Sequence, residues 1–230
     1  MMENETQLEF VALNHIGHSP SPVGALVRLK VFQVAGRHKQ LKQVDHAISA
    51  MERVWQDGAV QSGGVLRGTR GKHVVSLALV DALAGEATGP NRYTVEYSDH
   101  IASQPSSKTA QGQGLAPLYF LNIVHLAPGK REVMIRNFER TMPYVRKQPG
   151  YISTNLLVSR DNRQAIHVGQ FESRKHFQAM FRKQEVLRAF GRGLAPGMMA
   201  TVCGVLPKPP SLHLFELAHV VGSAEHNLLN

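Results

Sequence analysis

The sequence predicts an α+β fold built from two tandem units of one β-α-β-β-α-β pattern. Two observations favour this fold: the later half of the chain follows the pattern in order, and the earlier half repeats it in weaker form. The pattern is the split βαβ of ferredoxin-like folds. Apolar residues make up 43% of the 230 residues, which is enough for a proper core.

The later unit is the clearer of the two and is centred on residues 148–181. A Pro-Gly stop is followed there by an alternating strand, a turn rich in Asp, Asn and Arg, a second strand, and a helix that opens on Glu172-Ser173. Around this centre the sequence predicts a strand at 119–130, a helix at 131–147 and a last strand at 198–207.

The earlier unit repeats the same order of elements from Val27 onward. Its expected helix places five apolar side chains on one face, namely Leu41, Val44, Ile48, Met51 and Trp55. The remaining expected elements are a strand closed by Gly36, two strands within 58–80 around a Gly68–Gly71 turn, a shortened helix at 81–91 and a closing strand at 93–102.

The two units align with a nearly constant offset, which predicts an internal duplication. The alternative is a chance agreement between two amphipathic patterns. An offset of 92 residues places Gly58 on Gly150, Val74 on Ile166 and Leu79 on Phe171, and the helices need a slip of two further residues. The same offset sets Val75 against His167 and Lys30 against Asn122, so we expect the earlier unit to lack a functional site.

The chain is therefore expected to divide into five segments. They are an N-terminal strand and arm at 1–26, a degenerate unit at 27–102, a linker at 103–118, the main unit at 119–207, and a C-terminal segment at 208–230 that alternates over 211–222.

Two motifs in the main unit resemble the antibiotic biosynthesis monooxygenase family. They are the segment Pro149-Gly150-Tyr151-Ile152-Ser153 and the run Gln170-Phe171-Glu172-Ser173 with Phe177 after it. The resemblance implies that paired units close an α+β barrel, which here would form within one chain as a pseudo-dimer. It also implies that the C-terminal strand crosses to the neighbouring unit, and it leaves open whether two chains pair again as a homodimer.

The resemblance implies a site in the cleft between the sheet and its two helices. Quinone-forming members use an Asn, a Trp, a Tyr and an Arg, and these positions match His167, Phe171, Phe177 and Arg188 of this chain. Two hydrogen-bond donors of the family are therefore absent here, because Phe replaces both Trp and Tyr. Asn122 and Val124 share one face of the first strand and complete the candidate set.

The implied reaction needs no metal and no flavin, and it uses molecular oxygen as co-substrate. A phenol loses a proton, its anion passes an electron to oxygen, and the resulting peroxide loses water to give a quinone. His167 could act as the base near neutral pH, and Arg188 could hold the anion. The flat rings of an aromatic polyketide or similar polycyclic phenol would contact Phe171, Phe177, Phe181, Phe190 and Val124.

Other functions stay open beside this hypothesis. The chain could be a non-redox partner in the same chemistry, either a cyclase or a protein that binds an aromatic intermediate and supports an acidic carrier protein. Haem degradation is a weaker alternative: Asn122 lies where haem-degrading members carry an Asn, but Met180 and Phe190 occupy the positions of their helical Trp and His. Each candidate also has a structural reading, since a strand His is often structural and a helix Arg is often solvated.

Composition narrows the remaining classes. The single cysteine, Cys203, excludes a disulfide framework and favours a reducing cytoplasm, and no apolar window or basic leader indicates a membrane or secretion. The net charge of +9 is scattered, so we do not expect nucleic acid as a partner. The 12 histidines show no spacing typical of a metal site, so none is expected.

Overall fold

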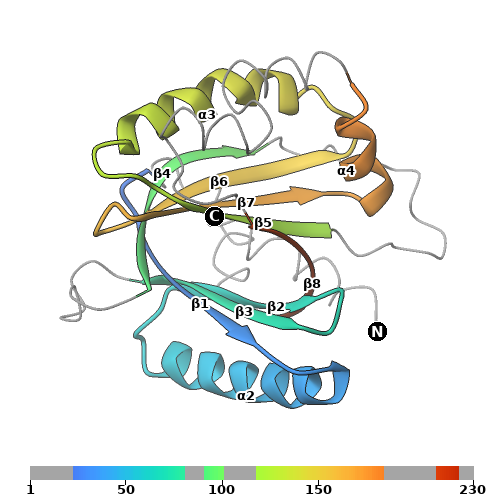
Figure 1. The fold of residues 1–230 in the computed structure, drawn as a ribbon. Helices are drawn as coiled ribbons and strands as arrows, with labels where there is room; N and C mark the ends of the chain where they lie inside the picture. Colours follow the sequence, from blue (N-terminus) through green and yellow to red (C-terminus); the bar gives the residue numbers. More distant parts are fainter. Residues whose placement is uncertain (1–22, 81–90, 101–117, 184–210, 223–230) are drawn as a thin grey trace, which may run out of the picture.

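The computed structural model describes residues 23–80, 91–100, 118–183 and 211–222 (Figure 1). The chain forms, in order, β1 (Leu26–Gln33), α2 (Arg37–Gln56), β2 (Ser62–Gly68), β3 (His73–Val80), β4 (Arg92–His100), β5 (Leu118–His125), α3 (Arg131–Val145), β6 (Tyr151–Ser159), β7 (Gln164–Phe171), α4 (Arg174–Met180) and β8 (Ser211–Gly222). The strand expected at 198–207, with Cys203, and residues 81–90 of the expected short helix lie outside the described residues.

The eight strands close an antiparallel barrel in the order β1-β3-β2-β8-β5-β7-β6-β4. Each unit has the ferredoxin-like strand order, which is β4-β1-β3-β2 in the first and β8-β5-β7-β6 in the second. The closing strand of each unit also pairs with the other unit, since β4 pairs with β6 and β8 with β2. The predicted fold class is therefore confirmed, whereas the proposed segment boundaries stay predictions.

Three layers of side chains hold the barrel and its helices together. The interior cluster draws on all eight strands and on no helix, as expected for a barrel narrow enough to be filled by side chains. A second cluster lies between α2 and the sheet of the first unit. A third joins α3 and α4 to the sheet of the second unit, so the helices cover opposite sides of the barrel (Figure 1).

The helix α2 packs through a different stripe from the one that the sequence predicts. Val44 and Met51 are buried as expected, but Leu41 and Trp55 are 45% and 43% exposed. The buried stripe instead includes Gln40, whose Nε2 donates to the backbone oxygens of Gly68 (2.7 Å) and His73 (2.8 Å) at the ends of the β2–β3 hairpin. These hydrogen bonds satisfy the buried Gln40 amide. The contact between α2 and the sheet is therefore centred on Gln40 and not on Leu41.

Strand pairing supports the duplication and corrects its alignment by one residue. Asn122 lies opposite His167 in the β5–β7 pair, and Lys30 lies opposite Ser76 in the β1–β3 pair. The left-handed turn residues Gly71 and Asn162 also correspond with an offset of 91 rather than 92. Ser76, and not Val75, is therefore the counterpart of His167. The correction matters because a slip of one residue moves a side chain to the other face of a sheet.

No helix in the described part of the chain is both long and apolar enough to cross a membrane.

The first testable prediction concerns β8, the strand that joins the two units. Phe215 on this strand is 1% exposed and lies in the interior cluster, whereas Leu212 on the same strand is 48% exposed. We expect Phe215→Ala to lower the free energy of unfolding by about 3–5 kcal/mol, because it opens a cavity in the barrel. Leu212→Ala should change it by no more than about 0.5 kcal/mol. Urea unfolding of the two variants measures the difference, and equal losses would contradict it.

Candidate functional site

The candidate site is the layer between the sheet of the second unit and the helices α3 and α4. Directly opposite residues on paired strands point to the same side of a sheet, so Asn122 on β5 and His167 on β7 share this layer. Val124 and Phe171 are buried in the same cluster. The structure thus brings four of the predicted residues to one face, and their roles stay predictions.

His167 sits deep in this layer between two aromatic rings. Its ring meets Phe120 and Phe138 edge to face, with ring centroids 4.7 Å apart in both cases. Its Nε2 lies 2.5 Å from Thr154 Oγ1 on β6, a hydrogen bond whose direction depends on the imidazole tautomer. His167 keeps part of its surface accessible, so the layer is not fully closed around the ring.

The surroundings change the acid–base behaviour that the sequence predicts for His167. Burial among protein atoms removes water from the ring and lowers the pKa of His167 to about 3. The imidazole is therefore neutral at pH 7 in the protein alone, and it is not poised as a base near neutrality. Taking up a proton becomes favourable only if an anion forms beside the ring at the same time.

Asn122 contributes a second polar group to the layer. Its Oδ1 is buried and has no hydrogen-bond partner among the described residues. Asn122 pairs directly with His167, which places the two Cβ atoms about 4.5–5.5 Å apart. A buried acceptor without a partner calls for an explanation, and a hydrogen-bond donor on a bound guest would satisfy it.

Aromatic side chains make up most of the remaining wall. Phe177 lies at the centre, with its ring centroid 4.9 Å from Phe120, 5.6 Å from Phe171 and 5.2 Å from Phe181. Phe181 is 39% exposed, so it stands at the edge of the layer. Sequence reasoning missed Phe120, which fits only because Gly169 has no side chain: a Cβ there would overlap the Phe120 ring.

The helix α4 begins where the sequence predicts. Ser173 is the N-cap, and its side-chain oxygen accepts a hydrogen bond from the backbone N–H of His176 (3.3 Å). This cap fixes the start of the helix that carries Phe177. Arg188 and Phe190 lie outside the described residues, so their assignment to the site stays a prediction.

The first half of the chain lends residues to this layer, which the sequence did not indicate. β4 crosses to β6, where Tyr97 lies opposite Leu156 and Asp99 opposite Thr154. The Tyr97 ring meets Phe138 at a centroid distance of 5.3 Å.

Asp99 is held by two partners. One carboxylate oxygen accepts a hydrogen bond from the Tyr151 hydroxyl (3.1 Å), and the other pairs with Arg146 (3.3 Å). Burial, together with the charge of Asp99, raises the pKa of Tyr151, so its phenol stays protonated as the donor.

The corresponding layer of the first unit lacks these polar groups. Ser76 and Lys30 stand where the second unit has His167 and Asn122, and Gly63 stands where it has Thr154. A Cβ at Gly63 would lie 2.8 Å from the sulfur of Met51, so α2 packs closely onto this sheet. The expectation that the first unit carries no equivalent site stays a prediction.

Two hollows in the described part of the chain lie away from His167. One, of about 360 Å³, is at the surface around Arg131, which pairs with Glu96 (2.6 Å) and Glu132 (2.6 Å). The other lies inside the barrel, on the opposite side of the sheet from the candidate site. In the described residues, no group of three or more His, Cys, Asp or Glu side chains is arranged to hold a metal ion.

Comparison with known proteins places this fold among solved structures. No protein-family model matches the sequence, and no curated protein matches it at a significant level. A crystal structure of an anthrone oxidase-like protein matches with a TM-score of 0.61 at 13% identity, over 88% of this chain and 94% of that chain. The chain shares its barrel fold with this structure and with others that are described as candidate monooxygenases.

The same barrel fold is shared by proteins with different descriptions. A candidate monooxygenase from Fusobacterium nucleatum matches with a TM-score of 0.57 at 9% identity, over 87% of this chain and 95% of that chain. A protein described as a major regulator of staphylococcal pathogenesis matches with a TM-score of 0.55 at 10% identity, over 84% and 99%. At such identities the likeness establishes the fold, and the activity has to be argued from the site.

The pKa of His167 predicts a dependence of stability on pH. Because the pKa is lower in the folded chain than the ordinary 6.5, stability is complete above pH 6.5 and falls as the pH drops toward 3. Between pH 6.5 and pH 5 this single group should cost about 2 kcal/mol. We expect His167→Gln to lose less stability than the native chain over this interval in urea unfolding.

His73 and His213 serve as an internal reference for this measurement. Their ring centroids lie 4.4 Å apart, and burial lowers the pKa of each, so they also destabilise the fold in acid. Both remain in the His167→Gln variant. The difference between the two proteins therefore isolates His167, and parallel pH profiles would show that its pKa is not lowered.

Proposed function

We propose that the chain is a cofactor-independent monooxygenase that oxidises a flat polycyclic phenol, of anthrone or aromatic polyketide type, to a quinone. One observation carries the proposal: Asn122 and His167 present two neighbouring polar groups beside a wall of aromatic and aliphatic side chains. The fold supports it, because structures described as monooxygenases and as anthrone oxidase-like share this barrel.

The proposed reaction balances without a resident cofactor. The substrate loses a proton, and its anion transfers one electron to oxygen, which becomes superoxide. The two radicals combine to form a carbon–oxygen bond, and protonation gives a hydroperoxide. Loss of water from the hydroperoxide leaves a carbonyl. One methylene group and one oxygen molecule thus become one carbonyl and one water.

Asn122 and His167 have complementary parts in the proposed first step. The unpartnered Oδ1 of Asn122 accepts the hydrogen bond of a substrate hydroxyl and so orients the ring. His167 then takes the acidic proton, and the imidazolium is stabilised by the substrate anion that forms beside it. Thr154 fixes the orientation of the ring through Nε2.

The aromatic wall matches the proposed class of substrate. Phe171, Phe177 and Phe181 present ring edges and faces at distances typical of aromatic packing, and a flat guest would extend this arrangement. Arg188 is proposed to hold the substrate anion or peroxide by charge-assisted hydrogen bonds. An acidic carrier protein could deliver the substrate to the basic residues Arg174, Lys175, Arg182 and Lys183 on and after α4.

Oxygen uptake with a hydroxylated anthrone tests the proposal. We expect the native chain to consume one oxygen molecule per quinone formed, faster than a protein-free blank that accounts for autoxidation. His167→Ala should lower kcat/KM by about 100-fold or more, because it removes the proton acceptor. Asn122→Ala should act mainly through substrate orientation, with a loss of about tenfold or more.

The first unit provides matched controls for these variants. Ser76 and Lys30 occupy the equivalent positions on the first sheet, so Ser76→Ala and Lys30→Ala should retain native turnover. Arg188→Ala extends the test to the residue that the family resemblance implies. If His167→Ala and Asn122→Ala turn over as fast as the controls, the site is wrong.

The neutral state of His167 favours one alternative, a protein that binds an aromatic intermediate without oxidising it. A neutral imidazole offers one N–H donor and one nitrogen acceptor to a guest, but with a pKa of about 3 it takes up protons poorly. The regulator with the same barrel fits a function without turnover. Calorimetry would then show binding of the anthrone that depends on Asn122 and His167, while the oxygen electrode records no uptake above the blank.

A further inference from the structure

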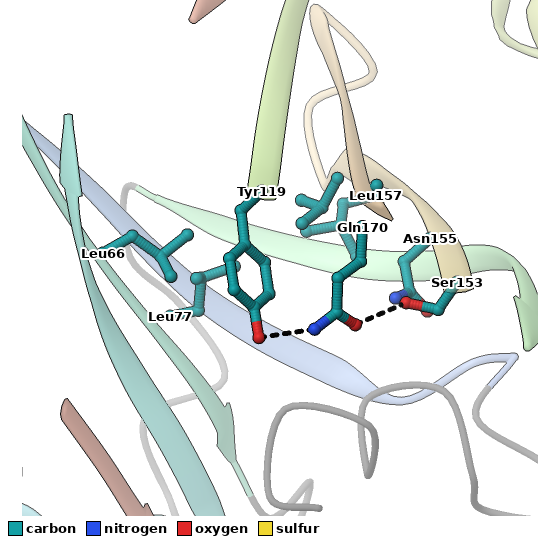
Figure 2. Close-up of a pocket in the computed structure, with 9 residues that line it drawn as sticks. Leu66, Leu77, Tyr119, Ser153, Asn155, Leu157 and Gln170 are labelled. Atoms are coloured by element: carbon teal, nitrogen blue, oxygen red, sulfur yellow. Dashed lines mark hydrogen bonds between the residues drawn. The ribbon is translucent and has the colours of Figure 1, made fainter. Parts of the chain in front are cut away.

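A second polar cluster lies inside the barrel, on the opposite face of the sheet from the candidate site (Figure 2). Successive residues of a strand point to opposite faces, so Thr154 faces His167 in the helix layer while Asn155 faces the interior. Both units line the hollow here. Leu66 and Leu77 come from the first unit, and the polar lining residues Tyr119, Ser153, Asn155 and Gln170 come from the second.

Three of these side chains form a continuous hydrogen-bonded chain. Ser153 Oγ donates to Gln170 Oε1 (3.1 Å), and Gln170 Nε2 donates to the Tyr119 hydroxyl oxygen (2.6 Å). Figure 2 shows both bonds as dashed lines that join the side chains of Ser153, Gln170 and Tyr119. All three residues are at most 6% exposed, so the chain is sealed from solvent and its members satisfy one another.

Asn155 lies beside this chain but is not satisfied by it. It is 5% exposed and lines the hollow, yet its Oδ1 has no hydrogen-bond partner among the described residues. Leaving a buried amide oxygen unpaired is costly, so buried groups of this kind usually bind a protein group or an ordered water.

The size of the hollow restricts what can pair with Asn155. The hollow has a cavity volume of about 20 Å³. One water needs a cavity of roughly 10–15 Å³, so the hollow admits water but excludes an organic ligand. The lining is uncharged, and one unpartnered oxygen is too few for a metal cation, which needs several oxygen ligands.

We propose that this hollow is a binding site for a single buried water molecule, held by Asn155 and the hydroxyl oxygen of Ser153. Water donates to the Asn155 oxygen and also accepts hydrogen bonds, so it suits either orientation of the amide. The Ser153 oxygen donates its proton to Gln170 and keeps lone pairs for a second contact. The site is polar and large enough, as a hydrated cavity requires.

The first unit shows that this polarity is not a requirement of the fold. By strand pairing, Gly64 corresponds to Asn155 and Leu79 to Gln170. Val27 corresponds to Tyr119. The barrel closes on that side with apolar residues or glycine at these three positions, and only Ser153 has a polar counterpart, Ser62. The water would brace β6 and β7 from the interior, and these strands carry Thr154 and His167 on the other face.

A high-resolution crystal structure of the full chain tests the proposal. We expect a density peak within about 3.2 Å of both Asn155 Oδ1 and Ser153 Oγ in the native protein. Asn155→Leu replaces the amide by an apolar group of similar shape and should abolish the peak. Oxygen-17 relaxation dispersion in solution should count one fewer long-lived internal water in this variant.

Ser62→Ala is the matched control. Ser62 Oγ is another buried oxygen without a partner among the described residues, but Ser62 does not line the hollow, so this variant should keep the water. The proposal is overturned if native density shows no peak at Asn155, or a peak with metal-like distances. It is also overturned if Asn155→Leu leaves the relaxation dispersion unchanged.

Discussion

The exchange of closing strands between the two units is the constraint on which the rest of the structure depends. β4 continues the sheet of the second unit, and β8 continues that of the first, so neither sheet keeps a free edge at these seams. Closure also gives both sheets a common interior that must be filled from all eight strands. The same exchange carries Tyr97 and Asp99 into the helix layer of the second unit. The pairing that closes the barrel therefore also decides which side chains surround the candidate site.

In the hairpin of β6 and β7, the strand register decides which side chains face the candidate site and which face the barrel interior. Along β6, Ser153 and Asn155 face the barrel interior while Thr154 faces the helices. Along β7, Gln170 faces the interior while His167 faces the helices. A shift of one residue in β7 would turn His167 into the barrel and Gln170 toward the aromatic rings, and a shift in β6 would turn Ser153 and Asn155 toward these rings. The interior hydrogen bonds between Ser153, Gln170 and Tyr119 favour this register. The same register brings Thr154 and His167 together on the helix side.

Local pattern was enough to predict the described elements from β1 to α4, the helix start at Ser173 and the face shared by Asn122 and Val124. The strand that closes the second unit beside β5 is β8, and not the strand expected at 198–207. These features depend on periodicity and capping, which are readable along the chain. The contributions of Tyr97 and Asp99 were not readable, because pairing between β4 and β6 joins distant segments. The sequence could not predict the lowered pKa of His167 for the same reason, because Phe120 and Phe138 meet around the imidazole ring only after folding. A constant offset along the sequence also could not reveal that β3 and β7 correspond with an offset of 91 residues, whereas β1 and β5 correspond with an offset of 92.

Both units contribute strands to the barrel, but the candidate site lies in the second unit. The first unit keeps the strands and the helix that closure needs, but Gly63 lets Met51 approach the sheet, and Ser76 and the exposed Lys30 replace the imidazole and the amide. The second unit has Thr154 at the position of Gly63, and the Thr154 hydroxyl forms a hydrogen bond with His167. A buried imidazole and an unpartnered amide weaken a core, and a fold can carry such groups where other parts supply its stability. Here the interior cluster is shared by both units, so the first unit stabilises the barrel in which the second holds His167 and Asn122.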